Sequence, residues 1–217
     1  MGKQEVIKRY YILCLGLIIA GFGVSFAKIA QLGVSPISST ANVVSEYFSQ
    51  ISLGNWIIIW NCILLLGQIT ILRKEFKMIE FLQIPISFIF GYCTDFGMFL
   101  FGWIPTEHYW VQLVLVFVSV MVLAFGLSLS VIANVVMNSG EAFVNAIARK
   151  GHKEFGNVKI AFDCSCVTIA VLVSCIIFDF HIIGIREGTV ISALFTGYVV
   201  KRFSRYLKEP LQAWFTK

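Results

Sequence analysis

The sequence predicts an all-α integral membrane protein in which six transmembrane helices form two inverted-topology three-helix repeats. Three observations lead to this prediction. The 217-residue chain is 58% hydrophobic and only 13% charged, whereas about a quarter of the residues of a soluble domain are charged. Long apolar segments fill most of the chain, and motifs of the first half return in the second half. The chain has too few polar residues to cover a soluble surface.

Six apolar segments come close to the roughly 17–25 residues that a spanning helix needs. We place the predicted spans at 10–30, 56–72, 81–101, 110–137, 158–178 and 188–203. The first segment is too long for the apolar core of a signal peptide, and no small-residue cleavage site follows it, so we expect it to remain in the protein. The six spans leave no room for a soluble domain.

Basic residues mark alternate connections between these spans. They precede the first span, follow the second and fourth spans, and begin inside the end of the sixth. The residues are Lys3, Lys8, Arg9, Arg73, Lys74, Lys77, Arg149, Lys150, Lys153, Lys201, Arg202, Arg205 and Lys208. The positive-inside rule then predicts that both termini lie in the cytoplasm. This pattern accounts for the net charge of +5, which therefore gives no indication of nucleic-acid binding.

The repeats are predicted at 1–108 and 109–217. Matching motifs occur in the same order in both halves, at nearly the same spacing. They pair Phe22-Gly23-Val24-Ser25 with Phe125-Gly126-Leu127-Ser128, Ala30-Gln31 with Ala133-Asn134, Ser35-Pro36 with Asn138-Ser139, Leu53-Gly54-Asn55 with Phe155-Gly156-Asn157, and Phe90-Gly91-Tyr92 with Thr196-Gly197-Tyr198. Asp95 and Lys201 follow the last pair at equal distances. Each repeat holds three spans, an odd number, so the second repeat is inverted, as in many secondary transporters.

Each repeat also predicts a short capped helix after its first span, at 36–50 and 139–150. Ser35-Pro36 has the form of a helix start, with a serine cap and proline at the first helical position. Asn138 is the corresponding cap, with Glu141 three residues on. These helices either lie along the membrane interface or enter the protein as re-entrant half-helices. In the second case their N-termini suit an anionic group.

Charged and amide side chains near the predicted spans are the candidates for a solute or ion pathway. They are Asp95, Asn134, Asn138, Glu141, Lys159, Asp163, Arg186 and Glu187. Asp95 is either functional or one half of a structural pair. If the fourth span continues to Asn138, both asparagines share one helix face.

Lys159 and Asp163 are four residues apart and form either a self-contained ion pair or a proton- or solute-binding carboxylate with a modulating lysine. Arg186 and Glu187 are either solvated loop charges or part of an anion site or outer gate.

No enzyme constellation is recognisable in the chain. It has no Ser/His/Asp nucleophile set, no metal-ligand spacing and no phosphate-binding glycine loop. His108, His152 and His181 fall in connections, and the six cysteines fall inside predicted spans, where cysteine acts as a small hydrophobe. We therefore expect no enzymatic activity, no cofactor and no metal.

Several motifs together resemble the YczE/YyaS/YitT family of bacterial integral membrane proteins. They are Leu32-Gly33-Val34-Ser35-Pro36-Ile37-Ser38-Ser39, Gly91-Tyr92 with Asp95, Ser139-Gly140-Glu141, Lys159-Ile160-Ala161-Phe162-Asp163 and Gly184-Ile185-Arg186-Glu187-Gly188-Thr189. The resemblance covers nearly the whole chain. It implies a small multi-pass protein of the bacterial inner membrane and names no substrate.

Two function classes follow from the sequence. The first is a secondary transporter of a small polar or charged solute, zwitterionic or otherwise, with proton coupling. The second is a non-transporting membrane partner subunit or assembly factor, which predicts a dry centre in which the charges pair off. The expected partners are the solute and the lipid bilayer, with no nucleic acid, and the sequence is compatible with a homo-oligomer.

Overall fold

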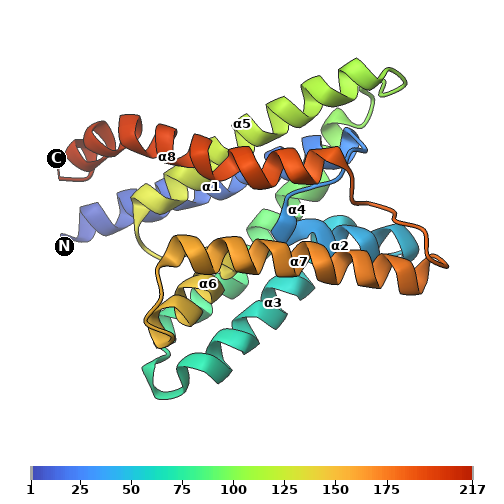
Figure 1. Ribbon diagram of the computed structural model, residues 1–217. Coiled ribbons are helices and arrows are strands. Elements are labelled where there is room, and N and C mark those ends of the chain that lie inside the picture. The colour runs from blue at the N-terminus through green and yellow to red at the C-terminus, as the bar shows by residue number, and fades with distance from the viewer. Residues whose placement is uncertain (1, 217) are drawn as a thin grey trace.

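The computed structural model describes residues 2–216, and the regular elements of that range are helices (Figure 1). They are α1 (Lys3–Ile29), α2 (Pro36–Tyr47), α3 (Leu53–Leu72), α4 (Gln83–Phe101), α5 (Tyr109–Ala133), α6 (Ser139–Lys150), α7 (Phe155–Ile177) and α8 (Glu187–Thr216). Two 3-10 turns, Arg73–Glu75 and Met78–Leu82, connect α3 to α4. The prediction of an all-α chain is confirmed.

Five helical segments in the described range are long and apolar enough to cross a membrane. They contain α1, α3, α4, α5 and α7. The predicted sixth span, 188–203, forms the first half of α8, which continues as one helix to Thr216. Basic residues begin at Lys201, so α8 as a whole is amphipathic and is not among the five.

Helix α5 ends earlier than the sequence predicts. The expected span was 110–137, whereas the helix stops at Ala133 because Asn134 takes a left-handed backbone conformation with φ of 49°. Asparagine is one of the residues that tolerate this conformation. The condition under which Asn134 and Asn138 would share a helix face is therefore not met, since the chain between them is not helical.

Helices α1 and α5 cross closely in the middle of the protein and run antiparallel. A Cβ on Gly23 would lie 2.6 Å from the Cα of Leu123, and one on Gly126 would lie 2.5 Å from the backbone nitrogen of Ala20. Only glycine fits where two helix backbones come this close. These two contacts are reciprocal in the repeat alignment, in which Gly23 corresponds to Gly126 and Ala20 corresponds to Leu123.

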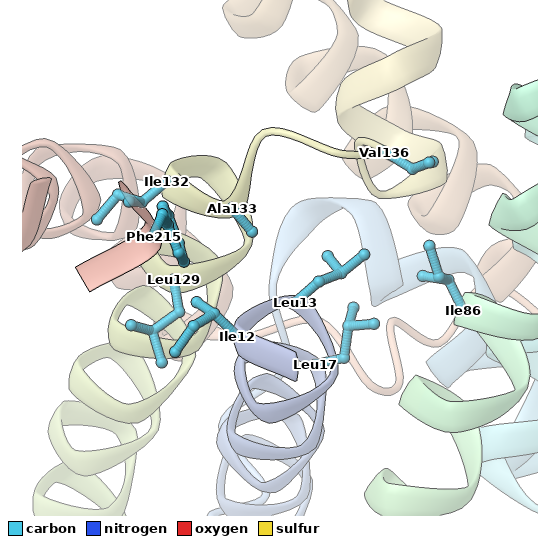
Figure 2. Close-up of a cluster of buried hydrophobic side chains, with 9 residues drawn as sticks. All are labelled: Ile12, Leu13, Leu17, Ile86, Leu129, Ile132, Ala133, Val136 and Phe215. Atoms are coloured by element: carbon cyan, nitrogen blue, oxygen red, sulfur yellow. The ribbon is translucent and has the colours of Figure 1, made fainter. Parts of the chain in front are cut away.

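The largest apolar cluster holds α1, α4, α5 and the end of α8 together. Figure 2 shows its buried side chains, which are Ile12, Leu13, Leu17, Ile86, Leu129, Ile132, Ala133, Val136 and Phe215. Phe215 is 2% exposed, so the end of α8 is docked onto the start of α1. The Lys8 Nζ atom donates to the Trp214 carbonyl at 2.9 Å.

The two short helices pack against the longer helices of the protein. Helix α2 packs against α3 and α7, and α6 packs against the same two helices. Each follows a left-handed residue, Gln31 (φ 58°) or Asn134, and an extended stretch. Their N-termini face each other, because a Cβ on Gly140 would lie 2.8 Å from Ile37 Cδ1.

The two ends of the molecule differ. Both termini lie at one end, on the left in Figure 1, together with the α3–α4 and α6–α7 connections. We call this the terminal end. There Glu75 forms ion pairs with Lys150 at 3.1 Å and with Arg149 at 3.8 Å. The α1–α2, α4–α5 and α7–α8 connections lie at the opposite end.

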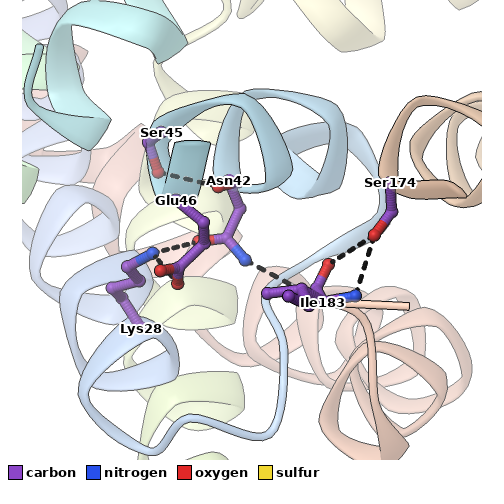
Figure 3. A network of polar contacts seen from close by, with 7 residues as sticks. Lys28, Asn42, Ser45, Glu46, Ser174 and Ile183 are labelled. Atoms are coloured by element: carbon purple, nitrogen blue, oxygen red, sulfur yellow. Dashed lines mark hydrogen bonds and ion pairs between the residues drawn. The ribbon is translucent and has the colours of Figure 1, made fainter. Parts of the chain in front are cut away.

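A polar network ties α1, α2 and the α7–α8 connection together at the opposite end. Figure 3 shows that the Lys28 Nζ atom reaches Asn42 Oδ1 at 2.7 Å and Glu46 Oε1 at 2.6 Å. The Asn42 amide donates to the Gly184 carbonyl at 2.9 Å. The Gly188 amide donates to the Leu32 carbonyl at 2.8 Å, beside an antiparallel bridge between Gly33 and Ile185.

Candidate functional site

A cavity of about 830 Å³ lies where the N-termini of α2 and α6 meet. Helices α3, α5, α7 and α8 form its walls. Ser35 and Ser38 of α2 line it from one half, and Asn138 and Glu141 of α6 line it from the other. Helix N-termini present free N–H groups and partial positive charge, so the cavity offers two such termini to one ligand.

The cavity extends toward the terminal end of the molecule. Glu80, Arg149 and Phe155 line that part of it, and the last two are exposed. At the opposite end, the network of Lys28, Asn42 and Gly184 closes the space between α1, α2 and the α7–α8 connection. The cavity therefore has charged and amide groups on largely apolar walls and reaches exposed residues at the terminal end.

Lys159 and Asp163 line the cavity as a bonded pair. The Lys159 Nζ atom lies 2.6 Å from Asp163 Oδ1, and both side chains are mostly buried. Their spacing of four residues places them on one face of α7, as the sequence predicts. The ion pair and the cavity occur together, so the two alternatives for this pair are not mutually exclusive.

Glu141 lines the same cavity without a bonded partner for one of its oxygens. The Oε2 atom is buried and accepts no hydrogen bond. Lys159 acts on Glu141 electrostatically, but it is already bonded to Asp163. A buried carboxylate oxygen without a donor is costly, and a bound donor or cation would remove that cost.

Neutral polar groups add to the lining, and the sequence prediction did not include them. Asn61 is 4% exposed and lines the cavity, and no side-chain hydrogen bond joins it to another described residue. Asn145 and Thr196 also line it, and the Thr196 hydroxyl has no partner. Asn61 interrupts an otherwise apolar helix, and that interruption is the signal by which sequence reasoning could have found it.

The two predicted asparagines of the α5–α6 connection both line the cavity. Asn134 lies at the left-handed turn that ends α5, and Asn138 caps α6 by accepting the Ser139 amide at 2.9 Å. The cavity therefore collects five of the eight predicted residues, namely Asn134, Asn138, Glu141, Lys159 and Asp163.

Three predicted residues lie elsewhere. Asp95 accepts hydrogen bonds from the Ser52 hydroxyl at 2.6 Å and from the Gly54 amide at 2.8 Å, and so fastens α4 to the start of α3. Arg186 and Glu187 form an exposed pair at 3.2 Å in the α7–α8 connection. The pKa of the Glu187 carboxyl lies below its usual range, chiefly because its own backbone N–H donates to it.

The described residues bring together no three His, Cys, Asp or Glu side chains that could hold a metal ion. The cavity instead combines carboxylates, one ammonium, amides and hydroxyls with apolar walls. Groups of this kind bind a small polar solute by hydrogen bonds and charge.

Five helical segments of membrane length and apolar composition, in a chain whose described elements are helices, define an all-helical multi-pass membrane protein. Within that class, the chain belongs to a family of unknown function (DUF6198), whose model matches residues 7–205. No curated protein and no solved structure matches the chain. The resemblance to the YczE/YyaS/YitT family stays a prediction.

Proposed function

We propose that the protein is a secondary transporter that carries a small polar or charged solute across the bacterial inner membrane with proton coupling. The observation that carries the proposal is the cavity of about 830 Å³, which is lined by charged and amide side chains and reaches exposed residues at the terminal end. A transporter needs a central binding site that opens to one side at a time. A non-transporting subunit predicts a packed centre, so the cavity favours the transporter.

The inverted repeat belongs to this proposal, and three features support it. The reciprocal contacts Gly23–Leu123 and Gly126–Ala20 are those of a two-fold axis that exchanges the halves. Helices α1 and α5, which begin the two repeats, run antiparallel. Left-handed residues at matched positions, Gln31 and Asn134, lead into the two half-helices.

Six spans with both termini in the cytoplasm complete the proposed architecture. The first half of α8 serves as the sixth span, from 188 to 203. Its support is that the termini share one end of the molecule, which requires an even number of crossings. The basic residues of the α3–α4 and α6–α7 connections lie at that same end, as the positive-inside rule expects of a cytoplasmic face. Access to the cavity is then from the cytoplasm.

Asp163 and Lys159 are the proposed coupling pair. They face the cavity and lie within 2.6 Å of one another. Protonation of Asp163 would break the ion pair and free Lys159, so the charge of the cavity would change with proton binding.

Uptake into proteoliposomes, across a panel of amino acids, amines and carboxylates under an imposed pH gradient, tests the proposal. We expect at least one solute to accumulate in a gradient-dependent manner. Asp163→Asn should lose the dependence on the gradient, whereas Glu187→Gln, an exposed acid outside the cavity, should behave as wild type. Absence of flux for every solute would favour the membrane subunit instead.

Water accessibility separates the two functions without a known substrate. In a background that lacks the six native cysteines, Asn134→Cys should react with a water-soluble maleimide added from the terminal end. A dry centre predicts no reaction at this position.

A further inference from the structure

The inner part of the cavity holds one carboxyl group that is in no ion pair with another described residue. Three charged residues line it: Glu141, Lys159 and Asp163. Lys159 is bonded to Asp163 at 2.6 Å, so that pair is neutral. Glu141 remains, with its Oε2 atom buried and unpartnered.

The elements packed around Glu141 bring no further cation to it. Helix α6 packs against α3 and α7. Helix α3 contributes the neutral Asn61 and Gln68 to the cavity, and α7 contributes the Lys159–Asp163 pair. The half-helix dipoles offset part of the charge on Glu141. Glu80 and Arg149, which are opposite in sign, stand near the mouth.

A second observation also points to a ligand. Thr196 of α8 lines the cavity, and its hydroxyl is buried with no hydrogen-bond partner among the described residues. Buried polar groups are almost always bonded, so an unbonded hydroxyl beside a cavity is a place for a ligand's polar group.

We propose that Glu141 is the cation-binding residue of the cavity, holding either the protonated amine of the solute or a proton. Both sources supply the same chemistry, a positive charge that donates a hydrogen bond to the carboxylate. The inference deepens the proposed transport function and rests on it for its role, but the site itself is present whether or not the protein transports.

Carbodiimide modification tests the site on the purified full chain. Dicyclohexylcarbodiimide reacts with carboxyl groups in apolar surroundings when they are protonated, and peptide mass spectrometry locates the adduct. We expect one adduct at Glu141, complete loss of that adduct in Glu141→Gln, and an unchanged adduct in Glu187→Gln. Competition on the wild-type protein makes the test independent of how well Glu141→Gln folds.

The competition uses ammonium chloride and potassium chloride, because the two cations have similar radii and only ammonium donates hydrogen bonds. Stronger protection by ammonium assigns the charge to an amine. Equal effects of the two salts, with labelling that falls as pH rises, assign it to a proton. Preferred labelling of Asp163, or no adduct at all, overturns the proposal. Labelling at Glu141 without measurable flux would keep the inference and reject the transporter.

A second inference rests on a different observation, the unequal packing of matched glycines. Gly54 of α3 and Gly91 of α4 are in tight contact, since a Cβ on Gly91 would lie 2.6 Å from the Gly54 carbonyl oxygen. Their counterparts in the repeat alignment are Gly156 of α7 and Gly197 of α8. Nothing lies within 4 Å of a Cβ built at either position. Helices α7 and α8 accordingly make almost no contact, although α3 packs along α4.

Polar residues near these glycines also differ between the two halves: they are bonded between α3 and α4 and unpaired between α7 and α8. Asp95 of α4 accepts the Ser52 hydroxyl at the start of α3. Lys201 corresponds to Asp95, and Glu154, at the start of α7, corresponds to Ser52. Lys201 and Glu154 have opposite charges and are both exposed, and they are not among the ion pairs of the described residues.

We infer that α7 and α8 close over the mouth of the cavity by packing Gly156 on Gly197 and pairing Glu154 with Lys201. The closed arrangement copies the one that α3 and α4 already have. The gate lies on the terminal side of the cavity, so its closure would complete the seal that the Lys28 network makes at the opposite end. This role rests on the proposed function, because only a transporter needs such a gate.

Disulfide trapping tests the gate in membranes without a substrate. The pair Glu154→Cys and Lys201→Cys, in a background without native cysteines, should cross-link on oxidation, since Ser52 and Asp95 are in direct contact in the matching half. The pair Glu154→Cys and Lys208→Cys, two turns farther along α8, is the control and should not cross-link. Adding Gly197→Leu, which the open state accommodates, should abolish the cross-link. Absence of the first cross-link, or its persistence with Gly197→Leu, overturns the inference.

Discussion

At the residue scale, the fold gives the carboxyl groups of Asp95 and Glu141 different surroundings. Asp95 accepts hydrogen bonds from Ser52 and Gly54, so its charge is compensated by α3. Glu141 has a buried oxygen with no donor and borders the cavity. A buried carboxyl group with hydrogen-bond donors contributes to structure, and one without a donor is available to a ligand.

Replacing Asp95 should therefore reduce stability. Asp95→Ala removes two hydrogen bonds to a charged group and should lower the free energy of unfolding by about 1.5–3 kcal/mol. Thermal unfolding in detergent measures the effect, with Glu187→Ala, an exposed acid, as the control. An unfolding temperature equal to that of the wild type would contradict the structural role.

Replacing Asn61, in contrast to replacing Asp95, should impair solute binding without lowering stability. Asn61→Leu replaces an amide that borders the cavity with an apolar side chain of similar size and breaks no hydrogen bond within the described residues, so the free energy of unfolding should stay equal or rise. Solute binding should be lost.

Gln68→Leu is the matched control on the same helix, because Gln68 is 1% exposed and bonded to Gln83 at 2.9 Å. It should destabilise the protein. Equal destabilisation by both substitutions, measured by thermal unfolding, would show that Asn61 is satisfied within the protein.

At the element scale, the two halves use the same helices in unequal ways. Helices α3 and α4 are in contact through Gly54 and Gly91, whereas α7 and α8 stand apart at Gly156 and Gly197. The cavity is lined by α7 and α8 at this gap. The gap between α7 and α8, which α3 and α4 do not have, borders the cavity.

Alanine substitutions at matched glycines should reveal this difference. Gly91→Ala forces a Cβ to within 2.6 Å of the Gly54 carbonyl oxygen and should destabilise the protein by more than about 1 kcal/mol. Gly197→Ala meets no atom and should stabilise α8 by about 0.5–1 kcal/mol through lower chain entropy. Thermal unfolding of the two variants in detergent decides, and equal effects would indicate that α7 and α8 are packed together in solution.

At the scale of the whole molecule, the contacts of the end of α8 place both termini together. Lys8 bonds to the Trp214 carbonyl, and Arg9 lies over the Phe215 ring at 4.6 Å. The α7–α8 connection lies at the other end, against the α1–α2 connection. A bilayer between the two ends would be crossed an even number of times.

Cysteine labelling in right-side-out vesicles should report this topology. Lys3→Cys and Lys208→Cys, each in a background without native cysteines, should be protected from a membrane-impermeant maleimide until the vesicles are opened. His181→Cys in the α7–α8 connection should react at once. Labelling of Lys3→Cys and Lys208→Cys from opposite sides would exclude an even number of crossings.

Local properties of the chain predicted much of the fold. The apolar runs predicted the helices, and Ser35-Pro36 and Asn138 predicted the starts of α2 and α6. The end of α5 was predicted wrongly, because Val135, Val136 and Met137 are apolar enough to continue a helix that the left-handed Asn134 ends. The apolar pattern alone does not report this backbone conformation.

The sequence by itself determined that this chain is helical and apolar enough for a membrane, and which of its connections are basic, because these properties depend on residues close together in the chain. Only the tertiary structure decided that Asp95 is bonded to Ser52, that Asn61 joins Glu141 at the cavity, and that α2 and α6 pack against α3 and α7. Those outcomes depend on which side chains meet across long separations in sequence. Helix packing sets such contacts, so one carboxyl group is hydrogen-bonded within the protein and another borders the cavity without a donor.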